Sequence, residues 1–174
     1  MRENLVGTRF ASLLCLLSLL ACAVATRDPN RMVATAYHAL PGDVRFVVVQ
    51  ADDLEEQGLE LIQELLGDEF SGRGFSRASS PDDAEVAVIY SFECLEDKPR
   101  STRAKEQVIG VTHLKLSIVG LGREGGPERG TPFWSATGST EDPGCNPTQS
   151  GLWLVPRMLE FLGQSVDPAR ALEN

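Results

Sequence analysis

The residues of this chain that could do chemistry are two histidines, two cysteines in its second half, and scattered serines and carboxylates. Among its 174 residues, His38 and His113 are the whole supply of imidazole. Neither has a partner four positions away, the spacing by which one helix face presents two imidazoles to zinc. Beyond the N-terminal segment, only Cys94 and Cys145 could supplement them. We therefore expect no metal site, and we expect each histidine to be structural or to face solvent.

Serines and paired carboxylates also lack a catalytic pattern. The Gly-x-Ser-x-Gly elbow that exposes the nucleophile of many serine hydrolases does not occur in the sequence. The acidic pairs Asp52–Asp53, Asp82–Asp83 and Glu141–Asp142 stand where helix caps or turns are expected. Adjacent residues do not face one another across a cleft, as the two carboxylates of a glycosidase must. The sequence thus predicts no catalytic residue, no cofactor and no enzymatic activity.

One glycine-rich segment needs a closer look, because Gly120–Gly125 matches the Gly-x-Gly-x-x-Gly pattern of dinucleotide sites. Such a site needs a helix directly after the glycines, so that its N-terminus can hold the pyrophosphate. Here Gly126, Pro127 and Gly130 follow, and then another strand-like segment. The pattern therefore indicates the loop of a β-hairpin.

The N-terminal residues are typical of an export signal. Arg2 and Arg9 give a positive start, Phe10–Ala21 is apolar apart from two serines, and small residues follow. The apolar stretch is shorter than the ~18–20 residues of a spanning helix. A buried N-terminal helix would alternate polar and apolar faces, which this segment does not do. We expect residues 1–21 to be a signal peptide and residues 22–31 to be a tether.

The cleavage site decides whether the protein is anchored. Leu19–Cys22 (Leu-Leu-Ala-Cys) resembles a lipobox, after which Cys22 would carry a lipid and place the protein at the periplasmic face of the outer membrane. Ala23 is not the Asp that usually retains lipoproteins in the inner membrane. The alternative is cleavage after Ala25, within the small-x-small sequence Ala-Val-Ala, which would release a soluble periplasmic protein.

Export would leave Cys94 and Cys145 in an oxidising compartment, where free thiols are uncommon. We therefore predict a disulfide between them. No Cys-x-x-Cys spacing occurs, so a redox motif is not indicated. Simple chain entropy values the closure of such a loop, of about 50 residues, at roughly 4 kcal/mol.

The charge of the chain argues against nucleic acid as a partner. The formal net charge is −9, and the arginines are scattered. A polyanion-binding protein needs a basic stripe that displaces counterions. The densest basic run, Lys98–Lys105, lies in a predicted loop; it could touch phosphate head groups, but a solvated loop is the favoured interpretation.

Hydrophobic periodicity predicts five strands and two helices. The strands are expected near Met32–Tyr37, Val44–Gln50, Glu85–Cys94, Val108–Leu121 and Pro132–Thr140, with a short edge stretch at Phe75–Arg77. Val44–Gln50 is nearly continuous in apolar residues, so we expect it to be central and covered on both faces. Val108–Leu121 alternates cleanly, so one sheet face should meet water.

The first helix should begin near the cap residues Asp52–Asp53 and end at Gly72, and the last should span Leu152–Gly163. The predicted apolar stripes are Leu54, Leu61, Ile62, Leu65, Leu66 and Phe70 in the first helix, and Leu152, Val155, Leu159 and Leu162 in the last. Runs of strands after a helix predict an α+β fold, a mainly antiparallel β-sheet with two amphipathic helices packed on one face. Residues 32–166 should form a single domain, and residues 167–174 a loose tail.

Trp134 and Trp153 are the aromatic residues with two interpretations. They stand near the start of the last predicted strand and the last predicted helix, where helix meets sheet. Core packing is the simpler role. The sharper hypothesis is a groove for a partner or ligand, because aromatic side chains anchor interfaces.

An ordered set of segments carries a family resemblance over most of residues 32–166. The set comprises Tyr37–Gly42 (YHALPG), Gly72–Arg77 (GRGFSR), Asp82–Tyr90 (DDAEVAVIY), Phe133–Ser139 (FWSATGS) and Leu152–Leu159 (LWLVPRML). With the lipobox leader, the chain resembles bacterial lipoproteins carrying domain of unknown function 4136. It departs from that pattern at Leu162–Gln164, where Phe-Pro-Gly is usual, and in having Cys94 and Cys145. The resemblance implies an envelope location and this α+β domain, and it assigns no catalytic residues.

Together these features predict a non-enzymatic cell-envelope lipoprotein, a small binding or assembly domain whose partner is an envelope protein. The alternative is a soluble periplasmic binder of a small apolar or lipid-like ligand, held near Trp134 and Trp153. An enzyme would require a cluster of histidine, nucleophile and carboxylate around His113 in the fold.

Overall fold

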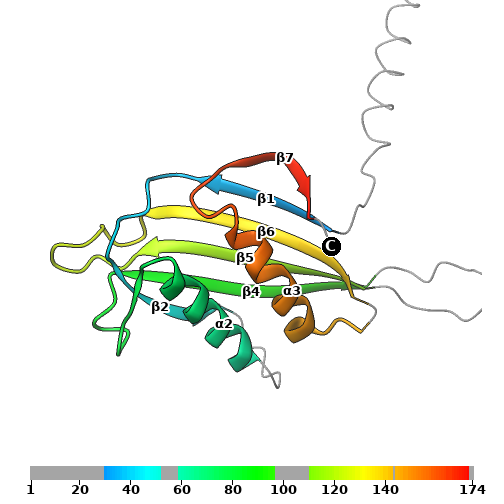
Figure 1. Cartoon of the computed structure of the whole chain (residues 1–174), viewed down its shortest axis with the longest axis horizontal. Coiled ribbons are helices and arrows are strands. Elements are labelled where there is room, and N and C mark those ends of the chain that lie inside the picture. The colour runs from blue at the N-terminus through cyan, green and yellow to red at the C-terminus, as the bar shows by residue number, and fades with distance from the viewer. Residues whose placement is uncertain (1–29, 52–58, 97–109, 143, 173–174) are drawn as a thin grey trace, which may run out of the picture.

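The sheet at the centre of the fold has seven strands in the order β3-β2-β4-β5-β6-β1-β7. The computed structural model describes residues 30–51, 59–96, 110–142 and 144–172 (Figure 1). Its strands are β1 (Arg31–Ala36), β2 (Arg45–Gln50), β3 (Ser76–Arg77), β4 (Val86–Glu96), β5 (Gly110–Gly120), β6 (Pro132–Asp142) and β7 (Val166–Ala171), and its helices are α2 (Leu59–Gly72) and α3 (Pro147–Leu159).

Most of the strand pairs are antiparallel. β4, β5 and β6 form a meander of three 11-residue strands, and β1 and β7 extend it at one side. β2 runs parallel to β4, because α2 lies between them in the chain and returns it to the same end of the sheet. The two-residue β3 pairs with β2 at the edge, where a short edge stretch was predicted.

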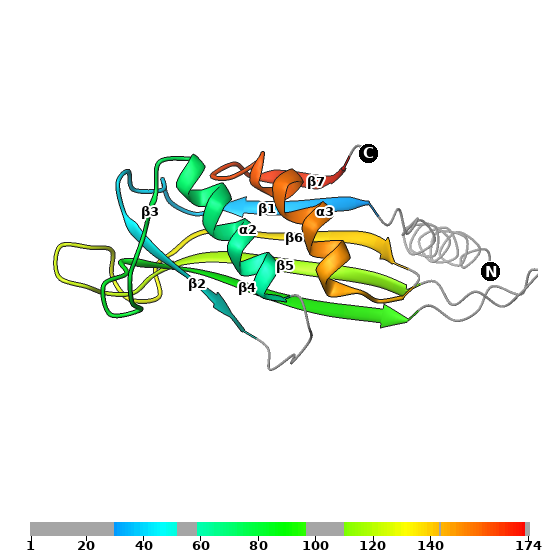
Figure 2. The same cartoon turned by 60° about the horizontal axis from the view of Figure 1, so that its bottom comes forward.

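Both helices lie on the same face of the sheet, as Figure 2 shows. Period-two alternation assigns the side chains of each strand to one face or the other. In β5, Leu114, Leu116 and Ile118 are buried beneath the helices, whereas His113 and Lys115 point to the uncovered face. Each large apolar side chain buried in this way contributes roughly 1.5–3 kcal/mol. The predicted α+β fold, with two helices on one face of a mainly antiparallel sheet, is confirmed.

The last helix starts earlier than predicted. It begins at Pro147, and the side chain of Asn146 caps it by accepting a hydrogen bond from the backbone N–H of Gln149. Proline at the first helical position is favourable, since its missing N–H would have no partner there. The prediction of Leu152 as a core residue was wrong, because its side chain is 46% exposed. The buried stripe consists of Leu154, Val155, Met158 and Leu159.

In α2, the buried apolar residues are Leu59, Ile62, Leu66 and Phe70. Leu61 was predicted in this stripe, but its side chain is 50% exposed, because a stripe that runs through Leu59 and Ile62 turns Leu61 outward.

Two further expectations about strands were wrong. β2 is next to the edge and not central, and Val49 is 39% exposed, since the helices cover only one face. The residues after Val166 were expected to be loose, but Val166–Ala171 forms β7 and pairs with β1.

The predicted signal peptide, Cys22, the cap residues Asp52–Asp53 and the basic run Lys98–Lys105 lie outside the described residues. Within the described part of the chain, neither helix has the length and apolarity that a membrane crossing requires.

Candidate functional site

Three loops converge at the end of the sheet where β4 and β6 begin: residues 37–44, 78–85 and 121–131 (Figure 1). Together with the start of β6 they line an open depression of ≈ 420 Å³, which we call the loop-end pocket. Its volume falls within the range of about 300–1,000 Å³ that is usual for small-molecule sites. The lining comprises apolar side chains (Ala39, Pro41, Val44, Pro127, Phe133), glycine backbone (Gly42, Gly125, Gly126) and two carboxylates (Asp43, Glu85).

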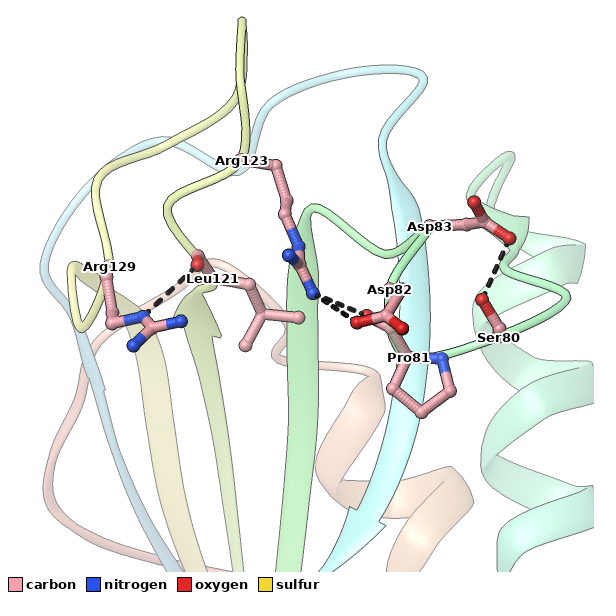
Figure 3. Close-up of polar contacts among 7 residues, drawn as sticks. All are labelled: Ser80, Pro81, Asp82, Asp83, Leu121, Arg123 and Arg129. Atoms are coloured by element: carbon pink, nitrogen blue, oxygen red, sulfur yellow. Dashed lines mark hydrogen bonds and ion pairs between the residues drawn. The ribbon is translucent and has the colours of Figure 1, made fainter.

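The long loop of the β5–β6 hairpin is tied to the turn before β4, as Figure 3 shows. The guanidinium of Arg123 donates to the carbonyl oxygen of Pro81 at 3.2 Å and forms an ion pair of 3.1 Å with Asp82. Within the loop, Nε of Arg129 donates to the carbonyl oxygen of Leu121 at 3.5 Å. The segment that matched the dinucleotide pattern therefore joins two antiparallel strands, which confirms the prediction of a hairpin loop.

Glu85, in the turn before β4, is bonded both to the start of β2 and to the β5–β6 loop. One carboxylate oxygen accepts the backbone N–H of Arg45 at 2.9 Å, and the other lies 3.9 Å from the Arg45 guanidinium. The carbonyl oxygen of Glu85 accepts the N–H of Leu121 at 2.9 Å. With 21% of its side chain exposed, the carboxylate forms part of the pocket wall.

The turn beside the pocket is fixed by Asp83. Its carboxylate accepts hydrogen bonds from the hydroxyls of Ser79 and Ser80, both at 2.9 Å. These two bonds favour the ionised form and hold the pKa of Asp83 below its usual value, the bond from Ser80 having the larger effect. The nearby guanidinium groups of Arg45 and Arg123 act in the same direction.

The chemistry of the pocket is that of a binding site. Its lining residues include no imidazole, thiol, hydroxyl or basic group. A ligand could pack on Phe133 and Val44 and bond to carboxylate oxygens or glycine backbone. In the described residues, no group of three or more histidine, cysteine, aspartate or glutamate residues is placed to hold a metal ion.

At the opposite end of the sheet, Cys94 and Cys145 form a disulfide with a Cα–Cα distance of 5.8 Å. This confirms the predicted pairing. The bond joins the end of β4 to the turn before α3, and Gly110 makes room for it. A Cβ at Gly110 would lie 2.5 Å from Sγ of Cys145 and 2.9 Å from the carbonyl oxygen of Asp142.

Asp142, which sequence reasoning treated as a turn residue, organises this end of the fold. Its buried carboxylate accepts the backbone N–H groups of Gly144, at 3.1 Å, and Asn146, and the hydroxyl of Ser150, at 2.7 Å. The negative charge lies beside the N-terminus of α3, where the helix dipole favours an anion. The available sequence signal was Asn146–Pro147, a cap residue followed by proline.

The predicted binding residues differ in accessibility. Trp134 is 0% exposed, and its Nε1 donates to the carbonyl oxygen of Gln164 at 3.0 Å. Trp153 is half-buried on α3, and the guanidinium of Arg157 lies 4.2 Å from its ring centroid. Trp134 is thus a core residue in this structure, and a role in binding stays a prediction for both.

The two histidines lie apart. His38 follows β1 and meets Phe133 edge-on, with the ring centroids 6.4 Å apart. His113 lies on the uncovered face of β5, opposite Glu93 of β4 and Ser139 of β6.

No protein-family model and no curated protein matches this chain. Among solved structures, a PDZ domain protein from Parabacteroides distasonis is similar with a TM-score of 0.57 and 11% identity, over 95% of this chain and 42% of that one. A DUF4136 family protein from Bacteroides thetaiotaomicron has a TM-score of 0.51 and 10% identity, over 79% of this chain and 98% of that one. The PelC dodecamer from Paraburkholderia phytofirmans has a TM-score of 0.48 and 14% identity, over 78% of this chain and 98% of that one. At these identities the likeness is one of fold alone, and it includes a solved member of the family that the sequence resembles.

Proposed function

We propose that this chain is a non-enzymatic lipoprotein of the bacterial cell envelope. A lipid on Cys22 holds it at the periplasmic face of the outer membrane, where its folded domain binds another envelope protein. The observation that carries the proposal is the disulfide between Cys94 and Cys145. Structural disulfides persist in oxidising compartments such as the periplasm and are rare in the cytosol. The disulfide therefore supports the export that the N-terminal residues predict.

The loop-end pocket supports binding over catalysis. Its wall offers apolar packing, backbone groups and the two carboxylates of Asp43 and Glu85, without a nucleophile or an imidazole. The carboxylate of Glu85 is already held by Arg45, at the backbone N–H and near the guanidinium. A group held in this way orients a ligand or fixes a loop.

The anchoring is tested with Cys22→Ser, and Cys15→Ser is the matched control. Cys15 lies inside the predicted leader, so its replacement leaves the mature protein unchanged. The unaltered chain and the Cys15→Ser variant are expected in the outer-membrane fraction, with an intact mass equal to residues 22–174 plus lipid. The Cys22→Ser variant is expected to leave that fraction while its domain stays folded. Crosslinking in intact envelopes then identifies the protein partner.

A mature chain that begins at Thr26 without lipid would replace the anchored form with a soluble periplasmic protein. A native chain that still begins at Met1 in the cytosol, with reduced thiols, would overturn the proposal.

A second candidate function, binding of a small apolar or lipid-like ligand, is favoured by the size and partly apolar wall of the loop-end pocket. The test uses a brominated alkyl detergent below its critical micelle concentration. If it enters the pocket, it quenches the fluorescence of Trp134, which follows the lining residue Phe133 in the chain.

The pocket variant for this test is Gly126→Leu. A Cβ at Gly126 would lie 3.5 Å from its nearest neighbours, so the fold should tolerate the side chain. Gly72→Leu is the control, because Gly72 is exposed and has nothing within 4 Å of a Cβ. Saturable quenching that only Gly126→Leu removes supports this function. Quenching that is the same in all three proteins, or absent, excludes it.

A further inference from the structure

Both described helices lie on one face of the sheet (Figure 2), so no described helix covers the opposite face. We call it the open face. It presents alternate residues of β2, β4, β5, β6 and β1. Most of the exposed large apolar side chains that the structure describes belong to it: Val33, Val49 and Leu95 by their strand positions, and Tyr37 by the hydrogen bond of its hydroxyl to Ser135. The remaining two, Leu61 and Leu152, lie on the helices.

The middle of the open face carries small side chains. Ser117 of β5 stands opposite Ser135 of β6, and Ser135 stands opposite Thr35 of β1. Side chains of this size leave a flat surface, and the apolar residues flank it. Sheets that pack face to face do so through such flat faces, about 10 Å apart.

The open face contains a row of residues that crosses the strands and has opposite charges at its two ends. The register places Glu93 of β4, His113 of β5, Ser139 of β6 and Arg31 of β1 in one row. This row is negative at the β4 end and positive at the β1 end. In the adjoining row, Lys115 bonds to Glu93 at 2.8 Å.

If a second copy presents this row in the reverse direction, its positive end lies over the negative end of the first copy. Consider a two-fold axis that runs parallel to the strands, between β5 and β6. Rotation about this axis places a second copy face to face with the first. Each row then lies over the same row of the second copy in reverse order, with β4 over β1 and β5 over β6. Glu93 then meets Arg31 of the second copy, and Lys115 meets Thr137 of the second copy. The three central rows bring no like charges together in this arrangement. An interface related by a two-fold axis uses the same patch on both subunits, which is what a self-complementary face permits.

From the position of the uncovered apolar side chains and the polarity of the charged row, we propose that the open face is a symmetric interface between two copies of this chain. The sheets of the two copies pack against each other, and the pairs of Glu93 with Arg31 set their orientation. Complementary charges across an interface fix register and exclude other arrangements. The proposal does not rest on the export or the anchoring of the chain.

Charge reversal tests the proposal through sedimentation equilibrium of the purified full chain in density-matched detergent. We expect a monomer–dimer equilibrium. Glu93→Arg faces Arg31 of the second copy with a like charge, and Arg31→Glu does the same with Glu93. Each single variant should weaken the dimer at least tenfold. The double variant Glu93→Arg/Arg31→Glu restores opposite charges across the interface and should recover part of the lost affinity; recovery is incomplete because Lys115 of the same copy loses its ion pair with Glu93.

Glu64→Arg is the control, because it makes the same change of charge at an exposed position of α2 on the helix side. It should leave the dimer constant unchanged. Circular dichroism and the intact Cys94–Cys145 disulfide establish that each variant is folded. A chain that is monomeric at every concentration overturns the proposal. So does a dimer that the single reversals leave intact, or one that the double variant does not recover.

Discussion

Gly138 of β6 lies directly beneath Met158 of α3, so closely that a Cβ on the glycine would stand 2.6 Å from Sδ and 3.1 Å from Cγ of the methionine. Leu154 of α3 closes the same space, with Cδ2 at 3.1 Å. The helix can therefore lie this low on the sheet only because residue 138 has no side chain. This contact sets the depth of the core between α3 and the sheet.

Gly138→Val should destabilise the fold by about 1–3 kcal/mol, since the extra carbons must displace Met158 and Leu154 in a packed core. Urea unfolding followed by circular dichroism measures the change. Gly72→Ala is the control, because a Cβ there meets nothing within 4 Å and alanine favours helix over glycine. Equal midpoints for Gly138→Val and the unaltered protein would mean that the helix does not approach the sheet this closely.

The disulfide should contribute about 4 kcal/mol to the free energy of unfolding, because it closes a loop with a sequence separation of 51. The double variant Cys94→Ala/Cys145→Ala should lose roughly that amount in urea unfolding. Reductant should destabilise the unaltered protein to a similar extent and leave the double variant unchanged. A reductant effect on the double variant would place the sensitive bond elsewhere in the chain.

Asp142→Ala should cost about 2–4 kcal/mol, since it leaves two backbone N–H groups and the hydroxyl of Ser150 without their buried acceptor. Asn146→Ala removes only the cap of α3 and should cost about 1 kcal/mol. Thermal unfolding of the two variants ranks them. If Asn146→Ala is the more damaging, the carboxylate of Asp142 is not the centre of this turn.

Those features of the sheet that depend on a local residue pattern could be predicted from the sequence. In β5, the alternation of Leu114, Leu116 and Ile118 with polar residues identified the face that meets water. The glycines after Gly120 identified a hairpin by excluding a helix. Both features depend on residues that are close together in the sequence, so the local residue pattern is sufficient to predict them.

Features that depend on distant segments were not predictable in the same way. β7 contains two charged residues and Pro168, with no alternating apolar pattern, and it is ordered by pairing with the backbone of β1, which its composition does not signal. The loop-end pocket joins Asp43 and Glu85, which lie in separate loops, to Phe133 at the start of β6, and only the strand order brings these together. The early start of α3, in contrast, could have been predicted from Asn146–Pro147, a cap residue followed by proline. The turn-forming residues around this pair favoured the interpretation as a turn.

The ionisation of Asp83 provides a test of the turn beside the pocket. Because the hydroxyls of Ser80 and Ser79 bond to the carboxylate, the pKa of Asp83 in the folded state is lower than its usual value of 3.8. The contribution of this group to stability is therefore present above pH 3.8 and is lost as the pH falls through the lowered folded pKa. Ser79→Ala/Ser80→Ala removes both donors, so the pKa of Asp83 should rise toward 3.8. An NMR titration of the side-chain carboxyl carbon measures it. Ser76→Ala is the control at a nearby exposed serine, and it should leave the titration unchanged. A pKa that stays equally low in the double variant would show that the guanidinium groups of Arg45 and Arg123, and not the serine hydroxyls, stabilise the carboxylate.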